Sequence, residues 1–354
     1  MYDLNDLLVM LNDRAGSDLH LSVGLPPVLR VHGALQPADG EGLTQSATKD
    51  LVYSVMTQEQ REGLERNREI DFAYSVPGVA RFRVNAYYQR ASVGAAFRLI
   101  PKEIRSFVEL GLPRVLEEFS MKPRGLVLVT GPTGSGKSTT LAAMIDHINT
   151  HRELHVVTIE DPIEYLHQHK RSMVNQREIG SDTRSFATAL KHVLRQDPDV
   201  ILIGEMRDLE TIAAALTAAE TGHLVLATLH TQGAAQTIDR IVDVFPPHQQ
   251  QQVRVQLSSS LQGVVSQQLL PTADGRGRIV AVETLSATSA VRNLVREAKA
   301  HQLDTVMQTG AQQGMVTMDL SLAELYGRGA VTLETAMQHS MDPSVLKQHV
   351  GKRA

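Results

Sequence analysis

The first hundred residues switch between helical and strand-like patterns of apolar positions. Leucines at positions 4, 7, 8 and 11 recur at helical spacing and predict an amphipathic helix. Residues 18–37 alternate apolar and polar positions around turns that contain Gly and Pro, which predicts short strands. A helical stretch with N-caps at Thr44 and Thr57 is expected next, followed by a β-rich stretch up to residue 101. We therefore expect residues 1–100 to form a small α+β domain.

From about residue 114 the pattern changes to repeated strand–loop–helix units. Four short stretches are apolar on both faces, and they begin at Gly125, His155, Asp199 and His223. Apolar strands that alternate with helices are typical of a parallel sheet covered on both faces. The predicted fold class is therefore α/β. Its parts are a domain over 1–100, a linker over 101–113, a parallel-sheet core over 114–285 and a helical region over 286–354.

The composition excludes several classes of protein. Hydrophobic residues make up 42% of the 354-residue chain and charged residues 21%, as in globular rather than disordered or fibrous proteins. The chain has no Cys, which excludes disulfides, thiolate zinc sites and cysteine nucleophiles. A net charge of −4 and the absence of Trp give no case for a nucleic-acid partner. Because we find neither a membrane-spanning apolar run nor a signal-peptide pattern, we expect a cytoplasmic protein without a transmembrane segment.

The strongest chemical signal is the segment GPTGSGKS at residues 131–138. It matches the pattern G-x-x-x-x-G-K-[ST] between a predicted strand and a predicted helix, as a phosphate-binding P-loop must. Its glycines let backbone N–H groups wrap a polyphosphate, and the following helix directs its positive dipole end at the same anion. Lys137 supplies a positive charge for the β- and γ-phosphates, and the Ser138 hydroxyl is expected to bind magnesium. The residues predicted to bind the nucleotide are Gly131, Pro132, Thr133, Gly134, Ser135, Gly136, Lys137, Ser138 and Thr139.

Acidic residues follow two of the predicted strands. Glu205 stands at the carboxyl end of a buried strand, where a carboxylate beside the phosphates can orient the attacking water. Position 204, where many P-loop proteins carry an Asp associated with magnesium, is glycine. The end of another strand supplies Glu160, Asp161 and Glu164 instead. We expect one of these three to hold magnesium through water, with Glu160 and Asp161 as metal candidates and Glu160 and Glu164 as catalytic candidates.

Two histidines flank the predicted strand HLVLATLH. His230 falls at the sheet edge that carries the other candidates, where it can sense the γ-phosphate or couple it to a neighbouring chain. His223, at the other end of the strand, is a second candidate for the nucleotide site. The alternative for both is a structural histidine whose ring nitrogens are satisfied.

Taken together, these segments resemble the secretion and type IV pilus ATPases. GPTGSGKST, VVTIEDPIEY, DPDVILIGEMRD and TGHLVLATLHTQG correspond to that family's Walker A, Asp box, Walker B and His box, in the family's order. The resemblance extends over almost the whole chain. The absence of a four-cysteine zinc module, usual in assembly and export members, and the segment AVRNLVRE make the retraction members the closer match. One departure is Gln232–Gly233, where a pair of Thr, Ser or Asn is more usual.

This resemblance implies a fold, a reaction and partners. The fold would be a PAS-like N-terminal domain, a RecA-like P-loop domain and a helical C-terminal region, assembled as a homo-hexamer. ATP and Mg²⁺ would lie between the two domains, with Arg83 and Arg98 as arginine fingers and Arg278 as a further candidate. Hydrolysis would drive interdomain motion and pilus retraction, acting on the inner-membrane pilus platform protein from the cytoplasmic side. The AVRNLVRE segment would transmit force or contact that platform, or would simply pack as an amphipathic helix.

Four other functions stay open on the sequence. The lack of an N-K-x-D segment argues against a guanine-nucleotide switch. Mild acidity and scarce aromatic residues argue against a RecA-like DNA translocase. A ring-forming adaptor that binds nucleotide without hydrolysing it, and an assembly or secretion motor of the same family, would share the phosphate-site residues.

Overall fold

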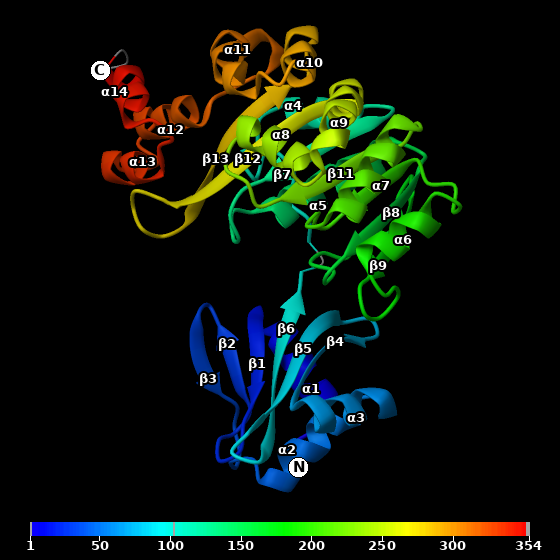
Figure 1. Cartoon of the computed structure of the whole chain (residues 1–354). Coiled ribbons are helices and arrows are strands. Elements are labelled where there is room, and N and C mark those ends of the chain that lie inside the picture. Colours follow the sequence, from blue (N-terminus) through cyan, green and yellow to red (C-terminus); the bar gives the residue numbers. More distant parts are fainter. Residues whose placement is uncertain (1, 102, 352–354) are drawn as a thin grey trace. The chain divides into compact units, whose positions relative to one another are not determined.

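The chain divides into two units, Met1–Glu103 and Ile104–Ala354, in the computed structural model (Figure 1). The structure describes residues 2–101 and 103–351. Each unit has its own sheet and its own hydrophobic core. The expected fold class is confirmed: an α+β unit precedes an α/β unit built on a mainly parallel sheet.

The N-terminal unit is a six-stranded antiparallel sheet with helices packed on its apolar face. The strand order is β3-β2-β1-β6-β5-β4. The strands are β1 (Gly16–Leu21), β2 (Val28–Val31), β3 (Ala34–Pro37), β4 (Glu69–Val76), β5 (Ala80–Gln89) and β6 (Ser92–Ile100). The helices are α1 (Leu4–Asp13), α2 (Gln45–Ser54) and α3 (Gln58–Asn67). Thr44 and Thr57 cap α2 and α3 as predicted, each accepting a hydrogen bond from a backbone N–H in the first turn.

The second unit is built on a seven-stranded sheet in the order β13-β12-β7-β11-β10-β8-β9. The strands are β7 (Gly125–Thr130), β8 (His155–Glu160), β9 (Met173–Glu178), β10 (Val200–Ile203), β11 (Leu224–Leu229), β12 (Leu261–Pro271) and β13 (Arg278–Ser286). Only the β12–β13 pair is antiparallel among these strands. The apolar runs predicted β7, β8, β10 and β11, whereas β9, β12 and β13 were not predicted because polar residues such as Asn175, Gln267 and Glu283 interrupt them.

Helices cover both faces of this sheet. One face packs against α4 (Val115–Ser120) and α5 (Lys137–His151). The other face packs against α6 (Phe186–Val193), α7 (Leu209–Glu220), α8 (Ala234–Asp243), α9 (Pro247–Ser260), α10 (Ser289–Arg296) and α11 (Leu303–Thr309). Two short 3₁₀ helices, η1 (Ala300–Gln302) and η2 (Ala311–Gln313), flank α11. Phe107 and Leu112, from the segment expected to be a linker, are buried in the same core as α4 and α5.

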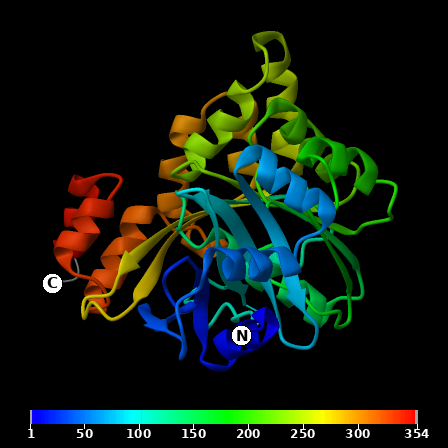
Figure 2. The same cartoon turned by 90° about the horizontal axis from the view of Figure 1, so that it is seen from below.

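Three helices at the C-terminal end of the chain form a small cluster with the β12–β13 hairpin. They are α12 (Met318–Gly327), α13 (Leu333–His339) and α14 (Pro343–Gly351). Their apolar side chains pack with Leu270 and Ala281 of the hairpin. Figures 1 and 2 show these orange and red helices beside the hairpin, at the end of the sheet away from β9. None of the described helices combines the length and apolar character needed to span a bilayer.

We expect Gly263→Ala to destabilise the second unit, because an added Cβ would stand 2.3 Å from the buried ring of Phe119. Overpacking of this kind costs roughly 1–3 kcal/mol, and each kcal/mol lowers Tm by about 2–4 °C in a domain of this size. Gly277→Ala is the matched control, because its added Cβ meets nothing closer than 3.8 Å. Thermal unfolding measures both, and equal Tm values for the two variants would contradict the packing argument.

Candidate active site

The P-loop leaves β7 in a backbone conformation that favours glycine. Gly131, Gly134 and Gly136 have φ values of 139°, 81° and 93°. A Cβ on Gly131 would also stand 2.3 Å from the carbonyl oxygen of Gln267 on β12. Gly136 precedes α5 and gives it no side-chain cap, so the first N–H groups of the helix are available to an anion.

Lys137 is held across the P-loop by two carbonyl groups. Its Nζ donates to the oxygens of Gly131 at 2.8 Å and Pro132 at 3.0 Å. Burial lowers the pKa of Lys137, and the negative charge of Glu205 opposes this shift. The ammonium group and the Glu205 carboxylate therefore belong to one electrostatic site.

The other P-loop side chains differ in exposure. Thr133 and Ser138 are exposed to solvent, whereas Ser135 is buried. The Thr139 hydroxyl lies 2.8 Å from the hydroxyl of Tyr165. Ser138 thus presents its hydroxyl to solvent at the start of α5, as a magnesium-binding role requires.

Parallel strands bring the predicted acids and His230 to the edge of the P-loop. Glu160 is the last residue of β8, Glu205 follows β10 and His230 follows β11. Because β7, β11, β10 and β8 are neighbours and run in one direction, these residues share one edge. His230 Nε2 lies 2.9 Å from Oε1 of Glu205. The structure therefore brings together two residues that lie 25 positions apart in the sequence.

Glu205 is kept ionised by its neighbours. Partial burial acts to raise the pKa of Glu205. The hydrogen bond from Nε of Arg207, together with His230 and the charge of Arg207, outweighs burial and lowers that pKa. A carboxylate in this state can accept a proton or orient a water molecule at neutral pH.

The three acids that follow β8 are in different environments. Burial raises the pKa of Glu160, although hydrogen bonds from Thr158 at 2.6 Å and Gln176 at 3.2 Å oppose the shift. Asp161 and Glu164 are exposed instead. Desolvation therefore disfavours a charged Glu160, while the other two carboxylates keep full contact with water.

Magnesium fits the oxygen groups at this edge. The candidate donors are the Ser138 hydroxyl and the exposed carboxylates of Asp161 and Glu164, and Mg²⁺ binds through oxygen atoms while keeping several water ligands. Over residues 2–101 and 103–351, no three His, Asp or Glu side chains gather in a cluster that could hold a metal by themselves. The donor set suits a magnesium ion held jointly by phosphates, water and one or two protein oxygens.

His223 does not lie at this edge. It precedes β11, and the N–H of Gly125 at the start of β7 donates to its carbonyl oxygen at 2.9 Å. The P-loop begins six residues later, which is about 20 Å along a strand. Its Nδ1 lies 3.0 Å from the Ala218 oxygen at the end of α7, so the structure does not bring His223 to this chain's P-loop, and a role at the nucleotide stays a prediction.

Arg278 begins β13 and pairs with Pro271, the last residue of β12. Since β12 is parallel to β7, this end of the hairpin points the same way as the P-loop. Pro271 lies four residues beyond Gln267, which is about 13 Å along the strand. Arg278 is exposed and stands on the P-loop side of the sheet, but at some distance from the loop.

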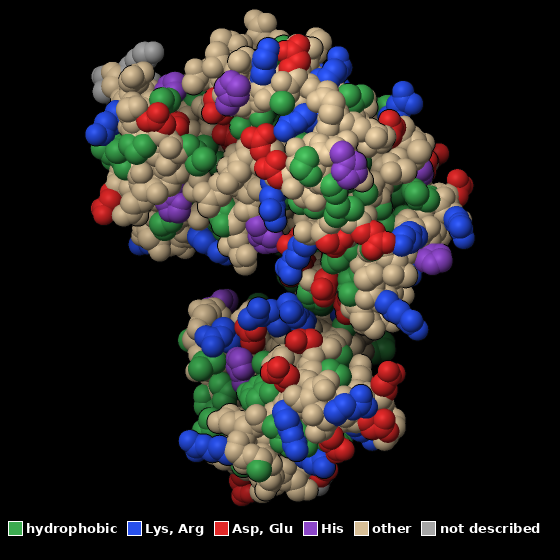
Figure 3. Space-filling model, viewed as in Figure 1, with side chains coloured by type: hydrophobic (Ala, Val, Ile, Leu, Met, Phe, Trp, Pro, Cys, Tyr) green, Lys and Arg blue, Asp and Glu red, His purple; other side chains and the backbone are tan. Residues whose placement is uncertain are grey.

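Arg83 and Arg98 are neighbours within the N-terminal unit. The pairing of β5, β6 and β1 places Arg83, Arg98 and Asp18 in one row across the polar face of the sheet. Arg98 Nε donates to Asp18 at 2.8 Å while 70% of its side chain stays exposed. Burial acts to raise the pKa of Asp18, but the hydrogen bond and charge of Arg98 outweigh it and lower that pKa. Figure 3 shows Lys and Arg side chains gathered on this unit.

Arg292 in the AVRNLVRE segment has a packing role. Its Nη1 donates to the carbonyl oxygens of Ser258 at 2.7 Å and Ser259 at 2.8 Å, and its Nε donates to that of Ala287. These carbonyls include the last turn of α9, which otherwise lacks donors. Arg292 is therefore held within the second unit, whereas Asn293 and Arg296 are exposed, and the external contact expected of the segment stays a prediction.

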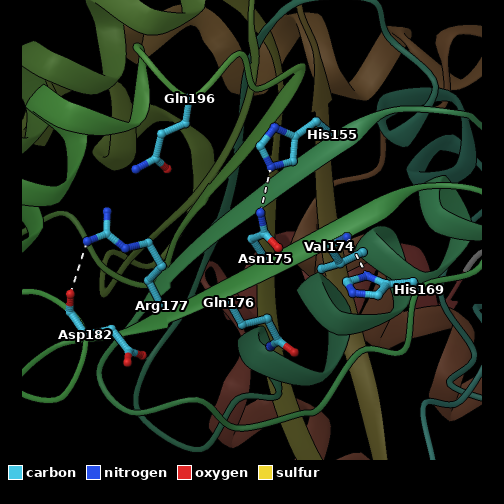
Figure 4. A pocket seen from close by; sticks show the side chains of 8 residues that line it. All are labelled: His155, His169, Val174, Asn175, Gln176, Arg177, Asp182 and Gln196. Atoms are coloured by element: carbon cyan, nitrogen blue, oxygen red, sulfur yellow. Dashed lines mark hydrogen bonds between the residues drawn. The ribbon is translucent and has the colours of Figure 1, made fainter.

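A separate hollow of about 650 Å³ follows the edge strand β9 (Figure 4). Its polar groups mostly bind one another. His155 Nε2 lies 3.0 Å from the Asn175 amide, and Arg177 donates to the Asp182 carbonyl oxygen at 3.1 Å. The Val174 N–H donates to His169 Nδ1, and the Glu178 N–H donates to the Asp182 carboxylate. Most polar groups of the hollow named here therefore already have partners, although Nη1 of Arg177 is buried without one.

Sequence reasoning missed three polar residues around the site. Gln176 binds Glu160, Arg207 binds Glu205, and Gln267 donates to Thr140 of α5 at 2.9 Å. The sequence did offer a signal for Arg207, because this residue stands only two positions after Glu205. Gln176 and Gln267 lie on strands that were not predicted, so nothing placed them near the P-loop.

Comparison with known proteins identifies the family. The family model described as "Type II/IV secretion system protein" matches residues 95–342. The chain belongs to this family. The type IV pilus retractation ATPase PilT of Pseudomonas aeruginosa is 51% identical, covering 96% of this chain and 99% of its own length. A twitching motility protein of Neisseria gonorrhoeae is 52% identical over 89% of this chain and 84% of its own length.

A solved structure matches the whole fold. The crystal structure of the pilus retraction motor PilT with bound ADP has 50% identity and a TM-score of 0.92, covering 98% of this chain and all of that one. The predicted resemblance to the secretion and pilus ATPases is thereby confirmed. The predicted enzyme class, a P-loop ATPase, is confirmed with it.

In a plot of kcat against pH, we expect Arg207→Ala to shift the loss of activity at acid pH to a higher pH. Arg207 lowers the pKa of Glu205, so its removal lets the carboxylate protonate at a higher pH and lose its ability to accept a proton. Because the Arg207 side chain is 77% exposed, salt should screen its charge. Raising the salt concentration should therefore shift the acid-side loss of kcat in the original chain to a higher pH as well. Lys191→Ala, which removes an exposed ion pair with Glu210, is the control. Superimposable pH profiles for the Arg207 variant and the original chain would disprove this role.

Proposed function

We propose that this chain is a hexameric motor ATPase that powers type IV pilus retraction, and hence twitching motility. The observation that best supports ATP hydrolysis is the position of the Glu205 carboxylate, which contacts His230 and Arg207 at the edge of the P-loop. The names of the relatives at about 50% identity support retraction as the task.

In the proposed reaction, the chain's own groups bind ATP and prepare the attack. The N–H groups of the P-loop and α5 bind the phosphates, and Lys137 leaves the carbonyls of Gly131 and Pro132 for phosphate oxygens. Glu205 orients the attacking water, and His230 fixes the rotamer of that carboxylate. Mg²⁺, when bound near Ser138 and the exposed carboxylates, supplies charge neutralisation for the phosphates.

The proposed assembly is a homo-hexamer in which the N-terminal domain, residues 1–100, serves the ATP site of a neighbouring copy. Arg83 and Arg98 would act there as arginine fingers, which typically contribute 10³- to 10⁵-fold in rate. Asp18 would hold Arg98 ready in the absence of phosphate. Motion of the two units about their junction, between Glu103 and Ile104, would then convert hydrolysis into work.

The proposed partner is the pilus platform protein at the cytoplasmic face of the inner membrane. Exposed residues of the AVRNLVRE segment, such as Asn293 and Arg296, offer a contact surface. An assembly motor of the same family is the second candidate, because it would use the same phosphate site.

Three substitutions separate binding from turnover. Lys137→Ala should abolish ATP binding, because it removes the charge that faces the phosphates. Glu205→Ala and Arg83→Ala should retain binding but lose turnover by more than roughly 100-fold, because they act only on the reacting centre. Fluorescent-nucleotide titration and phosphate release measure the two quantities, with Arg66→Ala, on the exposed face of α3, as the control. Equal turnover in the original chain and Glu205→Ala would support the non-hydrolysing adaptor.

Deletion of the gene in its source cell distinguishes retraction from assembly. Cells that keep surface filaments but cannot withdraw them would support the retraction motor. Bald cells would contradict it and favour the assembly motor.

A further inference from the structure

Glu283 is a buried carboxylate on β13 that joins two helices. It is 5% exposed, and each of its oxygens accepts a hydrogen bond from a backbone N–H. Oε1 accepts from Ala234 at 2.8 Å and Oε2 accepts from Met318 at 3.1 Å. Ala234 is the first residue of α8, and Met318 is the first residue of α12. One side chain thus caps the amino ends of two helices that are far apart in the sequence.

The capping role follows from the departure noted at Gln232–Gly233. Gly233 precedes α8 with φ 96° and has no side chain that could cap the helix. Glu283 takes the place of that cap, and Ser266 on β12 accepts from the Gly233 N–H at 2.9 Å. The amino ends of α8 and α12, where the helix dipole is positive, both face the carboxylate. Their charge offsets part of the free-energy cost of burying it. The β12–β13 hairpin therefore holds the start of α8 through two side chains.

The segment held in this way begins with His230. Only Thr231, Gln232 and Gly233 separate His230 from the capped residue Ala234. His230 in turn lies 2.9 Å from Glu205. On its other side, Glu283 holds α12, the first helix of the C-terminal cluster α12–α14. A continuous set of short contacts therefore runs from Glu205 to this cluster.

The neighbouring strand β12 carries a second link of the same kind. Successive side chains of a strand point to opposite faces. Gln267 donates to Thr140 of the P-loop helix at 2.9 Å, while Gln268 donates to the carbonyl oxygen of His339 at the end of α13. His339 Nδ1 also lies 2.8 Å from the Gln268 side-chain oxygen. Each strand of the hairpin thus contacts an element next to the P-loop edge, α5 or α8, and also contacts the C-terminal cluster.

We propose that Glu283 is a positioning residue that aligns His230 with Glu205 and couples the nucleotide site to the C-terminal helices α12–α14. The alignment part rests on the proposed role of His230 in turnover. The coupling part needs only that nucleotide binds in the P-loop.

The test compares Glu283→Gln with a matched control. A Gln side chain has nearly the same shape but only one acceptor oxygen, so one of the two helix starts loses its hydrogen bond to residue 283. Asp319→Asn is the control. Asp319 is a 7% exposed carboxylate on α12 that accepts from Ser340, Met341 and Asp342, all within the C-terminal cluster. Both variants weaken buried hydrogen bonds. Those of Asp319 lie within the C-terminal cluster, whereas Glu283 also binds the start of α8, behind His230.

Amide hydrogen exchange of residues 318–327, with and without added ADP, measures the coupling in the full-length protein. ADP should change exchange in α12 of the original chain and of Asp319→Asn, and should leave it unchanged in Glu283→Gln. If ADP binds but α12 of the original chain does not respond, the coupling is disproved. Because this readout needs no turnover, it stands apart from any failure of the proposed hydrolysis.

Steady-state kinetics test the alignment. Glu283→Gln should lower kcat roughly ten-fold with KM nearly unchanged, because a displaced His230 would misplace the Glu205 carboxylate while the phosphate contacts are kept. Asp319→Asn should keep both constants. A merely structural role for Glu283 would lower Tm equally in both variants without separating their kcat values, and that result would overturn the proposal.

Discussion

Parallel pairing of β7, β11, β10 and β8 is the constraint on which the rest of the structure depends. Strands that run in one direction must all end at one edge, so residues far apart in the sequence meet there. Lys137 at the start of the P-loop helix, Glu205 after β10 and His230 after β11 therefore lie at the same edge. The contact between Glu205 and His230 is a consequence of this topology, because β10 and β11 are direct neighbours.

Much of this arrangement could be predicted from the sequence. The apolar runs of β7, β8, β10 and β11 are unbroken, and the P-loop pattern fixes which end of β7 faces the phosphates. With the direction of the strands known, Glu205 and His230 follow at the same edge. The same reasoning, applied strictly, places His223 at the opposite edge, where its ring contacts the end of α7.

The remaining features could not be predicted, because they depend on polar residues in strands. Gln176, Gln267 and Glu283 interrupt the apolar patterns of β9, β12 and β13, so neither the strands nor their contacts were foreseen. Each of these side chains forms a hydrogen bond with a partner more than ten positions away: Glu160, Thr140 and the starts of α8 and α12. Burial of a polar group is explained only when that distant partner is known.

Two outward N–H groups of the edge strand β9 are bound by side chains that lie close to it in the sequence. In the pairing with β8, the N–H groups of Val174 and Glu178 point away from the sheet, and His169 and Asp182 accept their hydrogen bonds. A strand with two of its outward N–H groups already bound is a poorer template for another chain. The chain therefore carries, at these two positions, protection against aggregation through this edge.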